Sequence, residues 1–528
     1  MPEMFPDPFS HNDRLSLCPV CLARIGARHE AVAEEGGQTV YLVKRCPEHG
    51  TFRTPVWRGE PSITSWRKPK LPTPPAPQNA PNKGCPYDCG LCAQHRQHTC
   101  TVLLEVTARC NIACTYCFAS AGTGSAADDP GMPQLKEQLR KARAAAGPCN
   151  VQLSGGEPTM RNDLPAIISA AKELFPFVQL NTNGLRIARE SGYANALAEA
   201  GLDSVFLQFD GTTNDIYRAL RGAPLLADKL RAIHHLGEAG IGVVLVPTVV
   251  PGVNADNVGA LLHVAAAFSP VVRGVHFQPV SHFGRFPHSE QQDGQNGQSW
   301  QKGPLPQARI TLPEIMRGLE EQTGGLVAAA DFLPPGCEHA LCSFHANYLV
   351  HENGRLQRLS VQRKACSCEA APASEGADAA KAFVKRQWAA PAASASGESP
   401  SLGSAQSGQN LQIPEALHVA AFQQGKDSDP EVFLARLCEQ HAGAGSGVGS
   451  DAAGTAGQGT NDLDAFVRRA ATHVLAISAM AFQDAWNLDL ERLQGCCIHV
   501  SAPDGRLVPF CSWNCTAADG TPLHRRAS

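Results

Sequence analysis

The amino-acid sequence predicts an α/β protein whose core is a partial (β/α)6 barrel of the TIM type. Short apolar stretches alternate six times with amphipathic stretches between residues 101 and 325, a pattern typical of parallel βα units. No G-x-G-x-x-G follows the first apolar stretch, which disfavours the alternative of an open doubly wound sheet. Cysteines gather before and after this region, which predicts an N-terminal ribbon-like metal module and a C-terminal cysteine-containing extension.

The composition indicates a cytoplasmic, metal-binding protein. The chain has 528 residues, of which 43% are hydrophobic, and a formal net charge of −4. This length suits more than one domain, and this charge does not suggest a nucleic-acid partner. The N-terminus lacks the features of a signal peptide, and no apolar run is long enough for a transmembrane segment. In such a chain, 20 cysteines predict metal ligands rather than disulfides.

Residues 1–66 contain a candidate mononuclear metal site. Cys18 and Cys21 form one knuckle, and Cys46 lies on a second knuckle after a predicted strand with the sequence QTVYLVKR. The fourth ligand is either His49 or a cysteine from elsewhere, around Zn²⁺ or a rubredoxin-like iron. Incidental thiols on a surface loop are the alternative. The proline-rich segment that follows, 67–84, is expected to be a linker.

The loop at 85–100 carries a first C-x3-C-x2-C triad. Its cysteines are Cys85, Cys89 and Cys92, and Cys100 follows eight residues later. Four thiolates can hold all four irons of a [4Fe–4S] cluster, so we expect a closed auxiliary cluster here. A structural zinc is the alternative, because zinc sites with four cysteines use similar spacings.

The six predicted βα units follow in order along the chain. Each begins with a short apolar strand and continues with a helix that has one apolar face. Strands are expected at 101–107, 150–155, 178–183, 204–210, 242–249 and 273–279. Helices are expected at 133–146, 163–175, 193–201, 224–240, 257–268 and 311–323. Barrel active sites are built at the carboxyl ends of the strands, so the loops that follow the strands are expected to carry the chemistry.

A second triad follows the first predicted strand of the barrel. Cys110, Cys114 and Cys117 repeat the C-x3-C-x2-C spacing, with Tyr116 just before the last cysteine. Three cysteines hold three irons of a [4Fe–4S] cluster and leave the fourth iron open. The sequence SGGEP at 154–158 follows the second strand, and its glycines expose the backbone while its glutamate can accept from an amine. The triad alone is compatible with zinc, but both motifs at the ends of consecutive strands predict a reactive site.

These motifs closely resemble the radical SAM superfamily over residues 101–325. The resemblance implies that S-adenosylmethionine (SAM) chelates the open iron of a cluster on Cys110, Cys114 and Cys117, which are the catalytic cysteines. It also implies that one electron from a low-potential flavodoxin- or ferredoxin-type donor cleaves SAM to methionine and a 5′-deoxyadenosyl radical, which abstracts hydrogen from the substrate. The residues that it implies in cofactor binding are Tyr116, Gly155, Gly156, Glu157, Pro158, Asn183, Gln208 and Asp210. For the last three of these, ordinary turn capping is the alternative.

The C-terminal region, 326–368 and 461–528, brings further cysteines. A second candidate auxiliary site combines Cys337, Cys342, Cys497 (or Cys496) and Cys511. Residues 369–460 are expected to be a largely disordered insertion, because Ala, Gly, Ser and Gln dominate 369–410 and 440–460. A long amphipathic helical region is expected at 466–493, and a hairpin that turns at the sequence PDG follows it. The remaining cysteines are expected to be buried or free thiols: Cys149, Cys366, Cys368, Cys438 and Cys515.

The order of the motifs along the chain points to a particular subgroup within the superfamily. A CPxC…CPEHG module, GCPYDCGLC, the second triad, LQFDG-x4-IYRALRG and PDGRLVPFC occur in this order. This order resembles the subgroup of the archaeal tetraether lipid synthase and its bacterial relatives. The resemblance implies several iron sites and C–C bond formation on lipid chains, with a peripheral place at the membrane if the substrate is lipid.

Three functional hypotheses remain open at this point. The first is a radical SAM enzyme that acts on lipid chains. The second is a radical SAM enzyme of maturase or methyltransferase type that modifies a peptide or small molecule with the help of auxiliary clusters. The third is a non-catalytic metal or electron-transfer protein, which the open triad and GGEP disfavour. A long apolar tunnel at the barrel mouth would favour lipid, and a polar groove would count against it.

Overall fold

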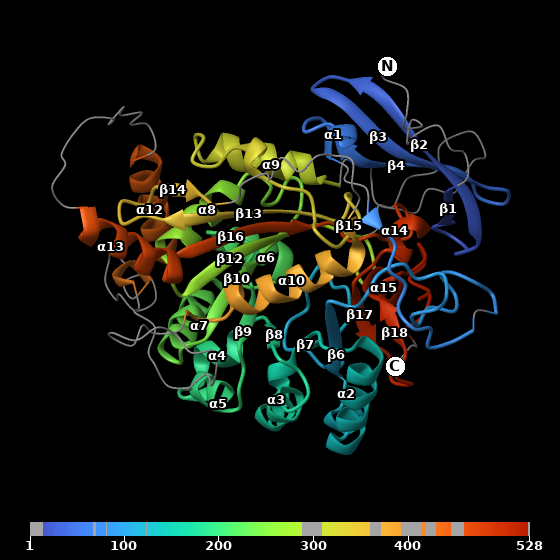
Figure 1. The fold of residues 1–528 in the computed structure, drawn as a ribbon, viewed down its shortest axis with the longest axis horizontal. Coiled ribbons are helices and arrows are strands. Elements are labelled where there is room, and N and C mark those ends of the chain that lie inside the picture. The colour runs from blue at the N-terminus through green and yellow to red at the C-terminus, as the bar shows by residue number, and fades with distance from the viewer. Residues whose placement is uncertain are drawn as a thin grey trace.

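The computed structural model of the protein has one large sheet at its centre, with the N-terminal module beside it (Figure 1). The structure describes residues 14–66, 70–80, 82–122, 124–287, 309–359, 371–391, 414–417, 429–444 and 459–525. Within these ranges, no helix is long and apolar enough to cross a membrane. The domain limits expected above remain a proposal.

The N-terminal module is an antiparallel sheet of four strands in the order β1-β2-β3-β4. The expected QTVYLVKR strand is present within β3, where Val40 and Leu42 are buried at alternate positions. This alternation is typical of a strand with one covered face. The elements are β1 (Arg14–Leu17), β2 (Arg24–Glu34), β3 (Gly37–Cys46), β4 (Gly50–Arg58) and α1 (Ile63–Trp66).

Six parallel strands form the barrel core and confirm the predicted (β/α)6 arrangement. Their order in the sheet, β6-β7-β8-β9-β10-β12, follows their order along the chain, as expected for successive βα units. A short strand, β11 (Thr248–Val249), pairs with the end of β12. The six strands are β6 (Thr101–Thr107), β7 (Asn150–Gly155), β8 (Val178–Thr182), β9 (Ser204–Gln208), β10 (Gly242–Val246) and β12 (Val272–Pro279).

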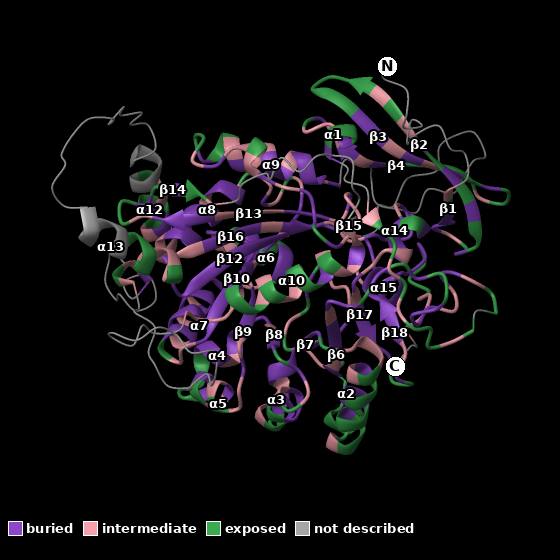
Figure 2. Cartoon of the chain, in the orientation of Figure 1, coloured by how far each residue is buried: buried purple, intermediate pink, exposed green. Residues whose placement is uncertain are grey.

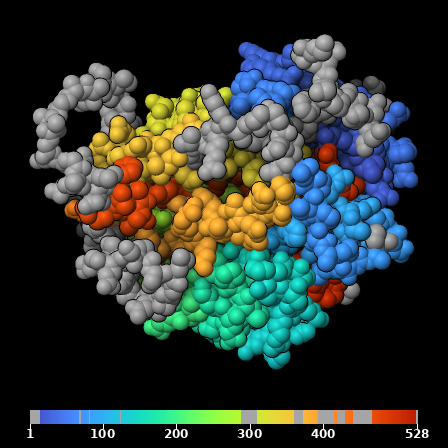
Figure 3. All heavy atoms as spheres, viewed as in Figure 1, coloured from blue at the N-terminus to red at the C-terminus, as the bar shows by residue number. Residues whose placement is uncertain are grey.

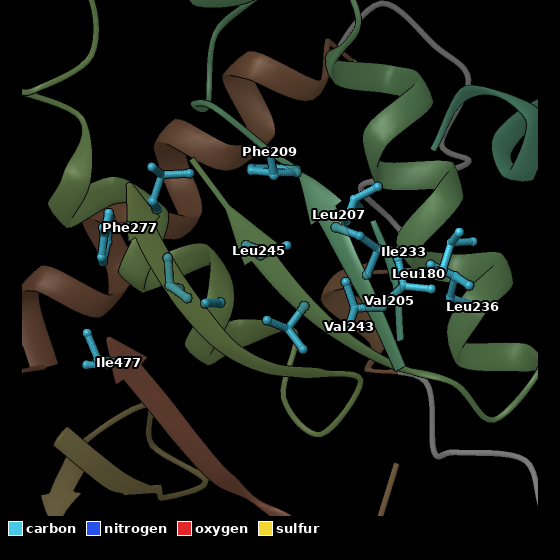
Figure 4. Packing of buried hydrophobic residues seen from close by; sticks show 14 of the residues in the cluster. Leu180, Val205, Leu207, Phe209, Ile233, Leu236, Val243, Leu245, Phe277 and Ile477 are labelled. Carbon is cyan, nitrogen blue, oxygen red and sulfur yellow. The ribbon is translucent and has the colours of Figure 1, made fainter. Parts of the chain in front are cut away.

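Helices cover the outer face of these strands, and a continuous apolar core lies between the two layers. Figure 4 shows part of this core, where Val205 and Leu207 of β9 lie near Ile233 of α7. Among the described residues, 3-10 turns occur at Ala126–Asp128, Pro158–Met160 and Ala329–Asp331. The helices are α2 (Met132–Ala146), α3 (Leu164–Lys172), α4 (Leu185–Arg189), α5 (Tyr193–Glu199), α6 (Asn214–Arg221), α7 (Leu226–Glu238), α8 (Val258–Ala267) and α9 (Leu312–Gln322).

The C-terminal region extends the barrel sheet at both of its edges. Beyond β12, the sheet continues with β16 in parallel and then with β13 and β14 in antiparallel pairing. Beyond β6, it continues with β17 in parallel and β18 in antiparallel pairing, which form the hairpin predicted at PDG. The added elements are β13 (Ser343–Val350), β14 (Leu356–Arg358), β16 (Val474–Met480), β17 (Ile498–Ser501), β18 (Leu507–Pro509) and α15 (Phe510–Asn514).

The prediction of a helical region over 466–493 is wrong for the middle of that segment. The helix α13 (Gly459–Thr472) ends early, β16 follows it, and α14 (Leu490–Gln494) begins only near the end of the predicted region. The sequence VLAISAM is a short apolar run, and such a run fits a buried strand as well as a helix. Strand pairing with β12 and β13 on both sides decides between the two.

The segment 369–460, expected to be largely disordered, contains ordered helices. The helix α10 (Ala373–Trp388) begins after β15 (Ala371–Pro372), which pairs with β5 (Lys70–Leu71). Figure 3 shows α10 as orange atoms across the middle of this face, and Figure 2 shows it in front of the buried sheet. A second helix, α12 (Pro430–Ala444), contacts α8. The expectation of disorder is therefore wrong for these two helices, and the rest of it stays a prediction, because most of the remaining residues of 369–460 lie outside the described ranges. The helix α10 packs against the barrel strands β10, β12 and β16, which its own sequence does not reveal.

Candidate active site and metal centres

A cavity of about 300 Å³ lies inside the barrel and has side chains of all six core strands in its wall or at its rim. The helix α10 closes it on one side with Ala380, Val384 and Trp388. Cys100, directly before β6, and Cys110, shortly after it, both line this cavity. With a rise of about 3.3 Å per residue, the ends of β6 are roughly 20 Å apart. The cavity therefore extends along the barrel from one end of β6 to the other.

The second triad lies at the carboxyl end of β6, as predicted. Cys110, Cys114 and Cys117 all line the cavity. The backbone N–H of Cys117 donates to the carbonyl of Arg285 (2.8 Å), whose side-chain Nε donates to the carbonyl of Cys114 (2.9 Å). Burial raises the pKa of Cys110 to about 11, so a positive metal centre is needed to keep this thiol deprotonated. Three thiols on one fixed loop fit a [4Fe–4S] cluster with one open iron.

The GGEP loop packs directly under the triad loop. A Cβ added to Gly155 would lie 2.2 Å from the carbonyl oxygen of Thr107, and one added to Gly156 would lie 2.2 Å from that of Arg109. The backbone N–H groups of Gly156 and Glu157 donate to these same two carbonyls. The glycines are therefore required by close backbone approach. They hold GGEP against the strand that carries the cluster cysteines.

The carboxylate of Glu157 is buried and already has four hydrogen bonds. Its Oε1 accepts from the backbone and hydroxyl of Thr159 (3.1 and 2.6 Å) and from the hydroxyl of Thr182 (2.6 Å). Its Oε2 accepts from the backbone N–H of Asn183 (2.7 Å). Glu157 thus connects the ends of β7 and β8. The predicted contact of this loop with the methionine amine of SAM remains a prediction.

Asn183, Gln208 and Asp210, which were predicted to bind the cofactor, have different surroundings. Asn183 and Gln208 line the cavity, but Asn183 also caps the next turn by accepting from Leu185 N–H (3.0 Å). Asp210 is fully buried, and both of its oxygens accept from the guanidinium of Arg221 (2.6 and 2.7 Å). Arg221 lines the cavity at this point. The role of Asp210 in cofactor binding stays a prediction, and in the structure this carboxylate positions Arg221.

Sequence reasoning missed two buried cations beside these residues. Arg221 is the last residue but one of the motif LQFDG-x4-IYRALRG, which was the available signal. Lys229 of α7 donates to the backbone carbonyl of Asn183 (2.5 Å) and to Oε1 of Gln208 (3.2 Å). Burial lowers the pKa of Lys229 to about 8, and the negative charge of Asp210 acts in the opposite direction. A helical pattern alone would not have singled out Lys229.

A second thiol group lies at the amino end of β6, on the wall of the same cavity. The sulfur atoms of Cys100, Cys337 and Cys497 lie within 4.8 Å of one another. Cys100 is 3.8 Å from Cys337, which is 3.5 Å from Cys497. Parallel pairing of β6 with β17 brings Cys100 and Cys497 together, and the N–H of Cys100 donates to the carbonyl of Cys497 (2.8 Å). Glu338 also lines the cavity here, and burial raises its pKa to about 8.

This second thiol group corrects two predicted ligand sets. Cys100 was expected to close the first triad, but the start of β6 fixes it beside Cys337. Cys342 and Cys511 were expected to join Cys337 and either Cys497 or Cys496, but they lie outside the group that holds Cys337 and Cys497. The alternative with Cys496 stays a prediction, since Cys496 interacts electrostatically with both Cys511 and Cys342. Cys342 instead accepts from the side chain of Arg492 (3.4 Å), and Cys511 from the backbone N–H of Gln483 (3.2 Å).

The first triad lies around a separate, smaller cavity. Cys85, Cys89 and Cys92 line it together with His95. His95 contacts the carbonyl of Cys496 (2.8 Å) and the ring of His499 (3.2 Å between Nε2 atoms). The predicted auxiliary cluster on these three cysteines stays a proposal. Of the cysteines expected to be free, Cys149 and Cys515 are buried, Cys438 is half-buried, and Cys366 and Cys368 lie outside the described residues.

The N-terminal module brings four ligand atoms together. Cys18, Cys21, Cys46 and His49 lie within 4.8 Å of one another. Nδ1 of His49 is 3.7 Å from the sulfur of Cys18 and 3.4 Å from that of Cys46. His49, rather than a cysteine from elsewhere, is therefore the fourth member of the group. Three sulfurs and one imidazole nitrogen fit a structural zinc site.

Two family models match the chain. The radical SAM superfamily matches residues 104–265, and the HMPTM N-terminal zinc ribbon domain matches residues 11–58. The first covers most of the barrel, and the second covers the module that carries Cys18 and His49. The chain is also similar to GTP 3′,8-cyclase of Edwardsiella ictaluri, with 34% identity over 30% of this chain and 49% of that protein. Among solved structures, SuiB of Streptococcus suis has 16% identity and a TM-score of 0.31, over 37% of this chain and 44% of that one.

A further relative matches nearly the whole chain. It is the 7,8-dihydro-6-hydroxymethylpterin dimethyltransferase of Methanocaldococcus jannaschii, which is 32% identical over 95% of this chain and 92% of that protein. The cysteine groups and the zinc ribbon fit an auxiliary cluster and a zinc ion. The protein is thus an enzyme that binds SAM and a [4Fe–4S] cluster, and the chain belongs to the radical SAM superfamily, in the family of this dimethyltransferase.

Proposed function

We propose that this enzyme modifies a small heterocyclic molecule by radical chemistry of the methyltransferase type. The observation that carries the proposal is the match to the Methanocaldococcus dimethyltransferase over 95% of the chain, which includes the zinc ribbon and the barrel. The methyltransferase alternative of the sequence analysis thereby becomes the main hypothesis. The partially matching GTP 3′,8-cyclase is named for another nitrogen heterocycle.

The residues of the cavity have distinct roles in this proposal. When bound, SAM and its cluster supply a 5′-deoxyadenosyl radical that takes a hydrogen atom from the substrate. Cys110, Cys114 and Cys117 hold the cluster at the barrel mouth, and a low-potential flavodoxin or ferredoxin supplies the electron. Arg221 places a buried positive charge at the cavity wall, where it attracts the carboxylate of SAM. The helix α10 limits access of water to the cavity, which protects a reactive radical.

Lipid-chain chemistry is kept as a second candidate because one side of the cavity is apolar. Leu103, Phe118, Phe283, Phe482 and Phe510 line that side. A cavity of about 300 Å³ lies at the lower end of the range for small-molecule sites. A pair of long lipid tails would need far more space, so the small-molecule proposal is favoured.

The proposal is tested with anaerobically reconstituted enzyme, dithionite and SAM. We expect 5′-deoxyadenosine to form and to increase when 6-hydroxymethyl-7,8-dihydropterin is added. With a one-carbon donor also present, mass spectrometry should show a product that is heavier by one CH2 unit for each hydrogen atom replaced by a methyl group. Replacing Cys110, Cys114 and Cys117 by Ala should abolish both signals. If lipid extracts of producing and deleted strains differ while the pterin is unchanged, the lipid candidate replaces this proposal.

A further inference from the structure

We propose that His95 is the fourth protein ligand of a [4Fe–4S] cluster on the first triad, and that this imidazole closes the cluster. The three cysteines of the triad, Cys85, Cys89 and Cys92, leave one iron of such a cluster without a thiolate. Cys100, the next cysteine along the chain, belongs to the other thiol group at the start of β6. The fourth ligand must therefore come from a different side chain. This site lies outside the barrel cavity, so the inference does not depend on the proposed substrate.

The small cavity of the first triad has four metal-binding side chains in its wall. Three are the cysteines of the triad, and the fourth is His95. The other described residues that line this cavity carry no thiol, imidazole or carboxylate. The backbone N–H of His95 donates to the carbonyl of Cys92 (2.9 Å), and this turn places the imidazole beside the triad. Only 4% of His95 is exposed.

Contacts with the loop before β17 and with β17 itself fix the orientation of the His95 ring. Nε2 lies 2.8 Å from the carbonyl oxygen of Cys496, which can only accept, so Nε2 carries the proton. Nε2 also lies 3.2 Å from Nε2 of His499, whose Nδ1 is 3.2 Å from the hydroxyl of Thr99. Nδ1 of His95 keeps its lone pair and has no hydrogen bond within the described part of the chain. Metal-bound imidazoles usually donate their other N–H to a backbone carbonyl in this way.

The spread of the four ligand atoms favours a cluster over the zinc alternative. One Zn²⁺ holds its sulfur ligands at about 2.3 Å, which places them roughly 4 Å from one another. The four ligand atoms of the N-terminal module have this compactness, since they lie within 4.8 Å of one another. Among the described residues, the first triad and His95 do not form such a compact group. Each ligand of a cubane binds a different iron, so its ligands lie further apart.

Two arginines hold the loop of the first triad and surround it with positive charge. Arg24 donates to the carbonyl of Cys85 (3.1 Å), and Arg506 donates to the carbonyl of Cys89 (3.0 Å). Gly90 has a φ of 153°, and a Cβ added there would lie 3.2 Å from the side chain of Arg506. The loop is thus packed closely against this cation. Positive charge beside the loop stabilises an anionic cluster with three thiolate ligands.

Closure by His95 determines what the cluster of the first triad does. SAM chelates an iron that has no protein ligand, so a closed cluster leaves SAM to the second triad. A histidine in place of a cysteine also raises the reduction potential of an iron–sulfur cluster. The cluster of the first triad therefore stores or passes electrons and does not start the radical.

The test is pulsed electron paramagnetic resonance (EPR) on the full-length chain with ¹⁵N-labelled histidine, reduced anaerobically with dithionite. The parent protein carries Cys110→Ala, Cys114→Ala and Cys117→Ala, which remove the cluster of the second triad from the spectrum. We expect a hyperfine coupling from one histidine nitrogen. A redox titration of the same sample, followed by EPR, gives the reduction potential of the coupled cluster.

Variants of the parent protein assign this coupling to one imidazole. His95→Cys exchanges the neutral imidazole for a thiolate, so the iron content should stay, the coupling should vanish and the reduction potential should fall. His98→Cys is the matched control, because His98 is an exposed histidine of the same loop, and it should change neither coupling nor potential. His95→Ala is a second variant, should His95→Cys fail to fold, and it should also lose the coupling. Circular dichroism shows whether each variant is folded.

Three results would each overturn the inference. The first is the absence of a nitrogen coupling in the parent protein. The second is a coupling and a potential that persist unchanged in folded His95→Cys or His95→Ala. The third is an unchanged iron content after Cys85, Cys89 and Cys92 are replaced by Ala, which would show that the triad holds no iron. These measurements use no substrate, so the methylated product tests the proposed function separately.

Discussion

Asp210 and Arg221 form a buried ion pair, and Asp210 holds the guanidinium of Arg221 in place at the cavity wall. Arg221 also reaches the backbone carbonyl of Tyr116 (3.5 Å), so it connects the end of β9 to the loop that holds the cluster. At this position a conservative substitution changes the charge balance of a site that is almost completely shielded from water.

We predict that Asp210→Asn impairs SAM binding without removing any atom from the cavity wall. The change leaves the buried guanidinium of Arg221 without its counter-charge, which costs about 3–5 kcal/mol. The KM for SAM in 5′-deoxyadenosine formation should rise at least tenfold. Asp215→Asn is the matched control, because Asp215 pairs with Arg218 on the exposed surface of α6, the helix that also carries Arg221. Equal KM values for the two variants would contradict the positioning role.

The imidazole of His276 makes folding stability depend on pH. Burial lowers the pKa of His276 to about 4, whereas an unfolded histidine titrates at about 6.5. Between these values the unfolded state binds more protons, so the unfolding free energy falls as the pH falls, by at most about 1.4 kcal/mol per pH unit. We expect a lower urea midpoint at pH 5 than at pH 7, and a smaller difference in His276→Gln. The control His351→Gln, outside the barrel, should behave as the wild type.

At the scale of elements, the zinc ribbon is a separate sheet that is fixed to the rest of the molecule by polar contacts. Lys44 of β3 is fully buried, and its ammonium donates to the carbonyl oxygens of Leu17 (2.7 Å) and Ala485 (2.5 Å). Arg14 of β1 pairs with Asp489 before α14 (2.7 Å). A correctly folded ribbon therefore helps to hold the loop between β16 and α14 in place.

We predict that His49→Ala lowers the zinc content of the purified protein below one ion per ribbon and reduces the thermal midpoint. Three thiolates remain in this variant, but a closed structural zinc site has four protein ligands. His49→Cys supplies a fourth sulfur and should restore both the metal and the midpoint. Full zinc content in His49→Ala, measured by elemental analysis, would show that the ligand set differs from the one inferred.

At the scale of the whole molecule, the barrel cavity connects two thiol groups at opposite ends of β6. We predict that replacing Cys110, Cys114 and Cys117 by Ala abolishes 5′-deoxyadenosine formation. Replacing Cys100, Cys337 and Cys497 by Ala should instead lower the metal content while 5′-deoxyadenosine still forms, because these thiols are roughly 20 Å away along the strand. Loss of 5′-deoxyadenosine in both folded variants would show that the two groups form one functional unit.

The sequence by itself determined the barrel and the open cluster triad, because both depend on local patterns. Apolar runs of strand length alternate with helical periodicity, and the cysteines of the triad lie within eight residues of one another. The zinc ribbon ligands also come from two short knuckles. Such features can be read from the sequence alone, because residues that are close in sequence contact each other at fixed spacings.

Only the tertiary structure decided the second thiol group, the buried cations and the cover of the cavity. Cys100, Cys337 and Cys497 come from three distant segments, which meet through the pairing of β6 with β17 and the packing of α10. The strand β16 and the helix α10 likewise obtain their order from partners far away along the chain. Spacing in the sequence carries no information about such contacts, because long-range pairing is fixed by burial and by the satisfaction of backbone hydrogen bonds in the folded molecule.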